Sequence, residues 1–193
     1  MPQIARESLL SLEAYARSRG EFRARVIDHK RRRTVHVGDH LTLLFEDELT
    51  VRYQIQEMLR IERIFEEADI RSELDAYNPL VPDGSNWKAT MLLEYPDPGE
   101  RHARLAELKG IEQRTWVQVE GCERVYAIAD EDLERENEEK TSSVHFLRFE
   151  LGAEMVRALR RDAGLTVGAD HPHYQASAPV GAETKRSLTE DLA

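Results

Sequence analysis

Hydrophobic and polar positions along the chain alternate between a helical and a strand-like period. Over residues 4–19 the apolar side chains recur at helical spacing, which predicts a short amphipathic helix that Gly20 stops. Residues 34–47 change to alternation, which predicts one strand with a single buried face. Residues 50–69 return to the helical period and form the clearest predicted helix of the chain.

The rest of the sequence indicates short strands joined by turns, with helices inserted between them. Strands are predicted over 87–95, 115–119, 123–129, 143–151 and 165–167, and helices over 70–77, 100–109, 153–162 and 182–192. The segments 115–119 and 123–129 are expected to form a hairpin. The charge run 130–140 is expected to be a solvated loop or a frayed helical turn. Strands joined mainly by short turns favour an α+β fold, in which helices pack on a mainly antiparallel sheet.

A single domain is expected for a chain of 193 residues that contains no low-complexity linker. We assign residues 1–193 to it, with 1–33 as a helical basic N-terminal segment and 177–193 as a tail that could be mobile. The neighbouring strand and helix patterns are expected to bury one common core. Its predicted members are Val37, Leu41, Leu43 and Phe45 from the strand, and Val51, Ile55, Met58 and Phe65 from the helix.

Composition narrows the range of partners and compartments. The formal net charge of −10 disfavours nucleic acid and anionic membranes as partners, because both would repel the chain. A single cysteine, Cys122, excludes an internal disulfide framework. The first residues do not resemble a secretory leader, and no window reaches the roughly 18 apolar residues of a membrane span. We therefore expect a cytoplasmic protein.

A basic segment interrupts this acidic chain. Residues 17–33 contain eight Lys or Arg against two acidic residues. Arg31, Arg32 and Arg33 are candidates to bind an anionic partner. The simpler alternative is a solvated stretch that forms salt bridges with the surplus of carboxylates. Tight nucleic-acid binding is not expected here, given the charge of the rest of the chain.

The helix over 50–69 contains an unusual carboxylate. At 100° per residue, Glu62 falls near the middle of the apolar stripe, whereas Glu57 lies on another side. A carboxylate buried in such a stripe needs a cationic partner, because isolated burial of its charge is costly. Glu62 is therefore expected to be buried and to pair with an Arg, or else to bind a metal ion or act as a general acid or base.

Histidines mark two further candidate positions. His145 shares a strand face with apolar residues, so it is either a hydrogen-bonded core histidine or a ligand. Asp170, His171 and His173 lie close together in a predicted loop, where they could hold a divalent transition metal. The alternative for this loop is an ordinary proline-containing turn that Asp170 caps. No glycine-rich or Gly-Lys-Ser/Thr phosphate-binding loop is present.

A set of residues spread over nearly the whole chain resembles one protein family. The set comprises Phe45-Glu46, Thr50, Gln54 to Glu62, Glu73-Leu74, Tyr77 to Pro82, Ala89-Thr90, Glu94, Val144 to Phe146, Phe149, Asp170 to Pro172 and Tyr174. It is similar to an uncharacterised bacterial family catalogued only as a domain of unknown function (number three-five-zero-one). Genes of this family often lie near rubrerythrin-like and iron–sulfur oxidoreductase genes, so the resemblance implies a redox or peroxide-defence context.

Two functions remain in competition. The first is a soluble accessory protein that binds a partner, such as a redox enzyme, through its basic segment or its C-terminal tail. The second is a metal-binding protein or metal-dependent enzyme that uses Glu62, His145, Asp170 and His171. Convergence of these side chains on one point would favour the metal site, and dispersion would favour the accessory protein.

Overall fold

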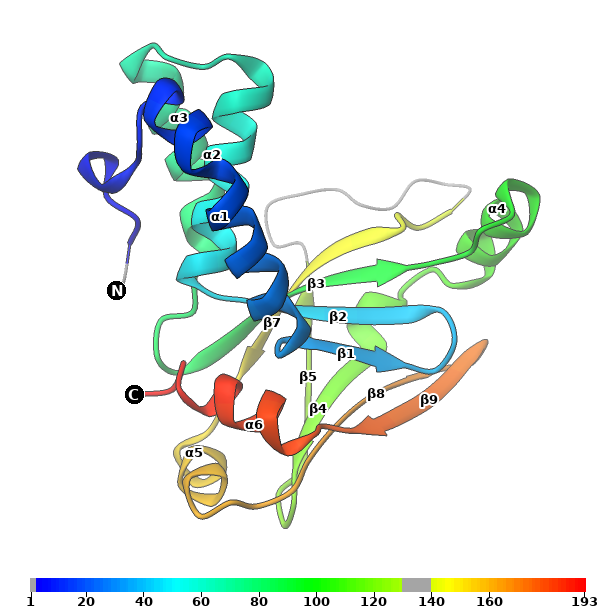
Figure 1. Ribbon diagram of the computed structural model, residues 1–193. Coiled ribbons are helices and arrows are strands. Elements are labelled where there is room, and N and C mark those ends of the chain that lie inside the picture. The colour runs from blue at the N-terminus through cyan, green and yellow to red at the C-terminus, as the bar shows by residue number, and fades with distance from the viewer. Residues whose placement is uncertain (1–2, 130–139) are drawn as a thin grey trace.

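The computed structural model describes residues 3–129 and 140–193, and Figure 1 shows their arrangement. The helices are η1 (Arg6–Ser8), α1 (Leu12–Arg31), α2 (Glu48–Glu62), α3 (Glu67–Tyr77), η2 (Asn78–Leu80), α4 (Pro98–Glu107), η3 (Ile111–Arg114), α5 (Ala153–Arg160) and α6 (Ala182–Thr189). The strands are β1 (Thr34–Val37), β2 (Leu41–Glu46), β3 (Asn86–Leu93), β4 (Thr115–Val119), β5 (Arg124–Tyr126), β6 (Ile128–Ala129), β7 (Val144–Glu150), β8 (Leu165–His171) and β9 (Tyr174–Pro179). The solvated loop predicted over 130–140 lies outside the described residues, apart from Lys140.

The strands form two sheets in which all described pairs are antiparallel. One sheet has the order β1-β2-β3-β7-β6 and the other the order β5-β4-β8-β9. The main hydrophobic core contains residues of both sheets, among them Phe45 and Phe149 from the first and Val117 and Val167 from the second. The predicted α+β fold with mainly antiparallel strands is therefore confirmed, with two sheets in place of one.

Helices α1, α2 and α3 form a separate structure that we call the helical arm. In Figure 1 the arm stands at one end of the sheets, whereas α4 lies at the other end. The arm has its own small core, which Ile4, Leu9, Val51, Ile55, Leu59, Ile70, Leu74 and Val81 form. No helix among the described residues is long and apolar enough to cross a membrane.

The prediction that the strand face and the helix stripe share one core is wrong. Leu43 and Phe45 belong to the main core, Val51 belongs to the core of the arm, and Phe65 is 70% exposed. Successive side chains of a strand point to opposite faces of the sheet. The odd-numbered residues of β2 therefore face the second sheet, and the remaining face is the one that the arm covers.

Two predicted element boundaries also need correction. Residues 34–47 form two strands, β1 and β2, joined by a tight turn in which Gly38 has a φ of 70°. Gly20 does not stop a helix, because it lies exposed in the middle of the 20-residue helix α1, which begins after the capping residue Ser11.

The C-terminal residues are packed on the protein and do not form a loose tail. Residues 177–193 contain the end of β9 and helix α6, and Leu188 and Leu192 are buried in the main core. The backbone N–H of Ala193 donates to the carbonyl of Gly84 at 2.8 Å. The sequence prediction of a tail that could be mobile is corrected accordingly.

Candidate functional site

A cavity of about 260 Å³ lies where the helical arm meets the outer face of the five-stranded sheet. We call it the arm cavity. It is lined by Lys30 of α1, Leu44 and Glu46 of β2, Val51 and Gln54 of α2, Tyr77 of α3, Leu80 of η2, Thr90 of β3, and Val144 and Phe146 of β7. Residues far apart in the sequence thus contribute to one small space.

The carboxylate of Glu46 is the buried charge of the arm cavity. The side chain ends strand β2, and the residue is only 8% exposed. Its Oε2 accepts a hydrogen bond from Thr50 Oγ1 at 2.5 Å, and its Oε1 accepts one from Thr90 Oγ1 at 2.6 Å. Among the described residues, no Lys, Arg or His side chain forms an ion pair with it. A carboxylate oxygen can accept more than one bond, so Glu46 can still bind a donor of a ligand.

The junction of β2 and α2 fixes the position of this carboxylate. Asp47 is the N-cap of α2, and its side chain accepts a bond from the backbone N–H of Thr50 at 2.9 Å. The Thr50 hydroxyl accepts a bond from the backbone N–H of Asp47 in return, also at 2.9 Å. This capping box orients the same hydroxyl that donates to Glu46.

The other walls of the arm cavity are mixed in character. Leu44, Val51 and Leu80 supply apolar surface, while Gln54, Tyr77 and Lys30 supply amide, hydroxyl and ammonium groups. The Lys30 ammonium lies 5.8 Å above the centre of the Tyr53 ring, a cation–π distance. The cavity therefore presents one positive and one negative side chain that are not paired with each other.

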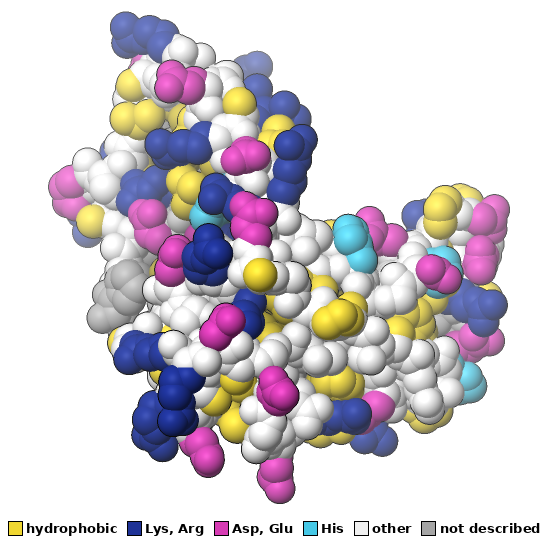
Figure 2. Space-filling model, turned by 60° about the horizontal axis from the view of Figure 1, so that its bottom comes forward, with side chains coloured by type: hydrophobic (Ala, Val, Ile, Leu, Met, Phe, Trp, Pro, Cys, Tyr) yellow, Lys and Arg dark blue, Asp and Glu magenta, His cyan; other side chains and the backbone are white. Residues whose placement is uncertain are grey.

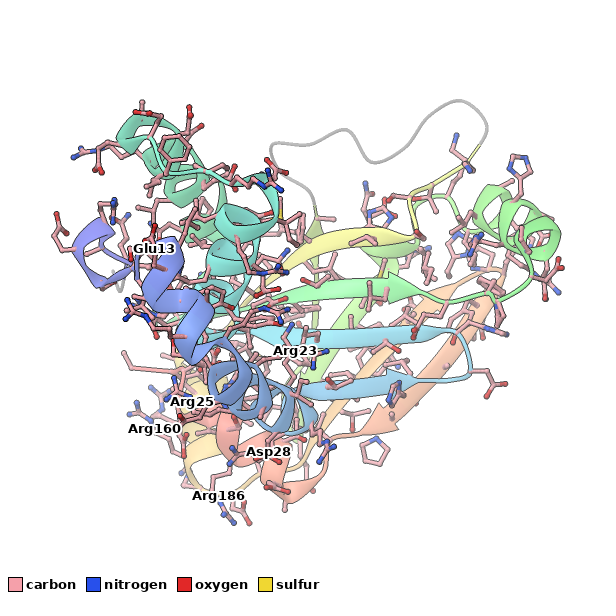
Figure 3. The ribbon with its side chains drawn as sticks, turned by 45° about the horizontal axis from the view of Figure 1, so that its top comes forward. Glu13, Arg23, Arg25, Asp28, Arg160 and Arg186 are labelled. Carbon is pink, nitrogen blue, oxygen red and sulfur yellow. The ribbon has the colours of Figure 1, made fainter. Side chains whose placement is uncertain are left out.

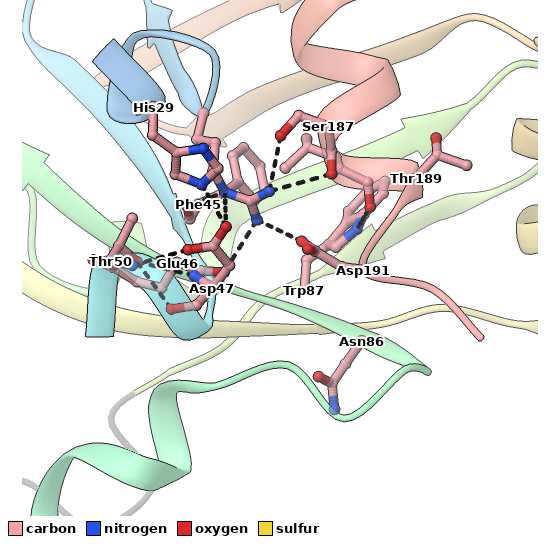
Figure 4. Close-up of polar contacts among 12 residues, drawn as sticks. His29, Phe45, Glu46, Asp47, Thr50, Asn86, Trp87, Ser187, Thr189 and Asp191 are labelled. Carbon is pink, nitrogen blue, oxygen red and sulfur yellow. Dashed lines mark hydrogen bonds and ion pairs between the residues drawn. The ribbon is translucent and has the colours of Figure 1, made fainter. Parts of the chain in front are cut away.

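The buried guanidinium of Arg33 binds backbone carbonyls at the end of β2, and Figure 4 labels its partners Phe45, Glu46, Ser187 and Asp191. Arg33 is 1% exposed and donates to the carbonyl of Phe45 at 2.9 Å and to the carbonyl of Glu46 at 3.1 Å. It also donates to the Ser187 carbonyl at 3.2 Å and to the Asp191 carboxylate. The C-terminal helix is thereby attached to the strand that carries Glu46.

Arg33 is consequently not part of a surface for anionic partners. Arg31 and Arg32 are exposed, and their ion pairs to Asp28, at 3.9 and 3.8 Å, are long. Figure 3 shows Asp28 on α1 together with other charged side chains, and Figure 2 shows acidic groups interspersed among the basic ones. The prediction for Arg33 is corrected, because main-chain carbonyls and Asp191 already occupy its donors.

Glu62 is exposed, so the prediction that it is buried is wrong. It is the last residue of α2, and the buried stripe already ends at Leu59. The half-buried carboxylate of this helix is instead Glu57, which accepts bonds from Arg19 at 2.8 and 2.9 Å and from the Tyr15 hydroxyl at 2.7 Å. The guanidinium of Arg19, with those contacts, lowers the pKa of Glu57 to about 2.

The histidine candidates have protein partners in separate places. His145 is fully buried, and its Nε2 lies 2.9 Å from Thr141 Oγ1 and 3.0 Å from the Ser142 carbonyl. Asp170 accepts a bond from the Tyr126 hydroxyl at 2.5 Å. His171 donates from Nε2 to the carbonyl of Lys109 at 3.0 Å.

These candidates do not converge. Within residues 3–129 and 140–193, no group of three or more His, Cys, Asp or Glu side chains could hold a metal ion. The run 168–174 is also not a loop, because it comprises the end of β8 and a tight connection to β9. Pro172 and His173, which form this connection, are both exposed.

Sequence reasoning missed Glu46 as a candidate, although a signal for it was present. Glu46, Tyr77, Thr90 and Phe146 all belong to the residue set that carries the family resemblance, and all line the arm cavity. The pattern of alternation placed Glu46 on the polar face of a strand. Only the packed helices show that this face is covered.

The fold and the cavity together define a two-sheet α+β protein. A small cavity, lined by a buried carboxylate, lies under its helical arm. A family described as "Protein of unknown function (DUF3501)" matches residues 3–192, and the chain belongs to this family. A crystal structure of a novel protein of unknown function from Burkholderia pseudomallei K96243 is 56% identical, covers 100% of each chain and has a TM-score of 0.95. Among curated proteins, none matches the chain significantly.

Proposed function

We propose that the protein is an accessory binding protein that holds a small zwitterion in the arm cavity. The ammonium group of the ligand would bind Glu46, its anionic group would bind Lys30, and its apolar body would contact Leu44 and Leu80. The observation that carries the proposal is the buried Glu46 carboxylate, which lines the cavity without an ion-pair partner among the described residues.

Charge burial supports this ligand class. A buried carboxylate without a cation costs free energy, and an ammonium group offsets that cost while it donates hydrogen bonds. Lys30 favours a ligand whose other end is negative, and so disfavours a simple amine. A cavity of about 260 Å³ with mixed walls suits a molecule the size of an apolar amino acid.

Isothermal titration calorimetry with three matched probes tests the proposal. Leucine has both charged groups, isoamylamine lacks the carboxylate, and isocaproate lacks the amine. Leucine is expected to bind best and isocaproate worst, and the other apolar amino acids are tested in the same series. Chemical-shift changes on ligand addition should centre on the backbone amides of β2 and α2.

Substitutions of Glu46 and of Glu62 provide a matched comparison on neighbouring elements. Glu46→Gln keeps the shape and removes the charge, so affinity should fall at least about tenfold, the factor that 1.4 kcal/mol represents. Glu62→Gln changes an exposed carboxylate of α2 and should leave affinity unchanged. Binding that is absent for every amino acid, or equal in both variants, would contradict the proposed function.

The cellular context is a separate proposal. The family resemblance implies a redox or peroxide-defence context. In that context the accessory protein would bind a redox enzyme while its arm cavity holds the ligand. Deletion of the gene should then lower resistance to peroxide, and a copy with Glu46→Gln should fail to restore it. Unchanged resistance in the deletion strain would argue against this context.

A further inference from the structure

A second cavity, of about 220 Å³, lies at the far end of the sheets from the helical arm. His40, from the turn between β1 and β2, and His173, from the turn between β8 and β9, both line it. The other walls are formed by Tyr95, Arg104, Glu107, Leu108 and Tyr174. Figure 1 shows these two hairpin ends next to each other, below α4.

The hydroxyl of Tyr174 fixes the two hairpin ends to each other. It donates to the carbonyl of Val37 at 2.6 Å and accepts from the backbone N–H groups of His40 at 3.1 Å and Leu41 at 3.2 Å. Gly38 makes this approach possible, because a Cβ at that position would lie 2.6 Å from the same hydroxyl oxygen. His40 and His173 therefore adjoin a hydrogen-bonded junction between the two sheets.

A hydrogen bond fixes the tautomer and the orientation of the His40 ring. A carbonyl only accepts hydrogen bonds, so His40 Nδ1 must carry the proton that it shares with the Glu94 carbonyl at 2.9 Å. The neutral ring then has its lone pair on Nε2. The ring also stacks on Tyr95, with centroids 4.1 Å apart and planes 19° apart. Histidines that bind metals commonly show this donation from the second nitrogen to a carbonyl, which orients the ring.

His173 provides the second imidazole of this cavity, and His171 does not. Both ring nitrogens of His171 are occupied, because Nε2 donates to the Lys109 carbonyl and Nδ1 accepts from the backbone N–H of His173 at 3.2 Å. Within the described residues, the ring of His173 makes no hydrogen bond or ion pair, and the residue is exposed at the cavity. Its ring can therefore turn toward a bound ion.

We propose that His40 and His173 bind one divalent transition metal ion in this cavity. His40 Nε2 and the His173 ring are the protein ligands, and water completes the coordination, since the described residues contain no preassembled group of three. Neutral imidazole is a preferred ligand of Zn²⁺, Ni²⁺ and Cu²⁺. The site is separate from the arm cavity and does not depend on the zwitterion proposed there.

Titration of the chelator-treated protein with Zn²⁺ alone tests this site by calorimetry. We expect saturable binding of one Zn²⁺ per chain, and a loss of affinity of at least about tenfold in both His40→Gln and His173→Ala. His102→Ala alters another exposed histidine, on α4, and should not change the affinity. Circular dichroism of each variant checks that the fold is retained, and His173→Ala is the safer variant because its side chain is exposed.

Proton–nitrogen correlation spectra of the histidine rings give a second measurement. Addition of Zn²⁺ should shift the Nε2 resonance of His40, leave its Nδ1 protonated, and leave the resonances of His36 and His102 in place. The proposal is overturned if Zn²⁺ does not bind, if the His40 and His173 variants bind it with wild-type affinity, or if the shifts centre on other histidines.

Discussion

The buried guanidinium of Arg33 donates a hydrogen bond to the carboxylate of Asp191, which lies 158 residues further along the chain. Arg33 also holds the carbonyls of Phe45 and Glu46, so one side chain connects the C-terminal helix to the strand that carries the arm-cavity carboxylate. Asp47 lies beside this cluster, with Oδ2 at 2.5 Å from His29 Nε2. The C-terminal segment is therefore part of the frame behind the candidate site.

Replacing Arg33 should be strongly destabilising. Arg33→Ala leaves the carbonyls of Phe45, Glu46 and Ser187 and the Asp191 carboxylate without their donor. This loss should lower the free energy of unfolding by about 3–5 kcal/mol. Arg32→Ala removes an exposed neighbour and should change it by less than about 0.5 kcal/mol. Urea denaturation of both variants measures the difference. Equal stability of the two would mean that the buried cluster contributes nothing.

Asp191 should make stability depend on pH near neutrality. Burial raises the pKa of Asp191 to about 6, against an ordinary value of 3.8, even with Arg33 beside it. A raised pKa in the folded state means that its contribution is full below about pH 4 and is lost as the pH rises through 6. The stability of the wild type relative to Asp191→Asn should therefore fall between pH 4 and 7, by up to about 3 kcal/mol. Urea melts across this range, with both proteins in the same buffers, provide the measurement.

Glu57 should have the opposite pH dependence. Its pKa is lowered to about 2, chiefly by Arg19, so its contribution is full above about pH 4.5 and is lost as the pH falls through 2. Glu57→Gln should therefore cost about 3 kcal/mol at pH 7 and progressively less below pH 4. Glu62→Gln, on the same helix, should cost little at any pH, because that carboxylate is exposed. A larger loss for Glu62→Gln would restore the sequence-based assignment.

The contrast between Glu57 and Glu62 shows what a periodic pattern can predict. The phase of α2 was correct for Val51, Ile55 and Leu59, which are buried in the arm. The pattern does not say where packing stops along a helix. In α2 the packing ends at Leu59, about one turn before Glu62. It also does not say that a second helix covers the side that carries Glu57, whose partners Tyr15 and Arg19 come from α1.

Most helices and strands could be predicted because their side chains repeat with the local period. The arrangement of those elements depends on contacts between distant segments, which periodicity does not report. Glu46 illustrates this limit, since a strand with one polar face is also what an exposed sheet would show. His40 and His173 line one cavity because two hairpins from different sheets end beside it.

Replacement of Gly20 and of Gly38 by alanine should change the free energy of unfolding in opposite directions. Gly20 is exposed within α1, and a Cβ there would meet no atom within 4 Å. Gly20→Ala should therefore raise the free energy of unfolding by about 0.5–1 kcal/mol, because alanine loses less conformational freedom in a helix. Gly38 has a positive φ, and its Cβ would collide with the Tyr174 hydroxyl. Gly38→Ala should lower stability by about 1–3 kcal/mol.

A double-mutant cycle separates the two causes at Gly38. Tyr174→Phe removes the hydroxyl oxygen that lies 2.6 Å from the added Cβ, but it leaves the backbone φ unchanged. If the collision dominates, Gly38→Ala should cost clearly less in the Tyr174→Phe background than in the wild type. If backbone strain or the close approach to Ala176 Cβ, at 3.0 Å, dominates, the two costs should be equal. Zn²⁺ titration of the same variants then shows whether this junction positions His40, since loosening it should weaken the metal site without altering either imidazole.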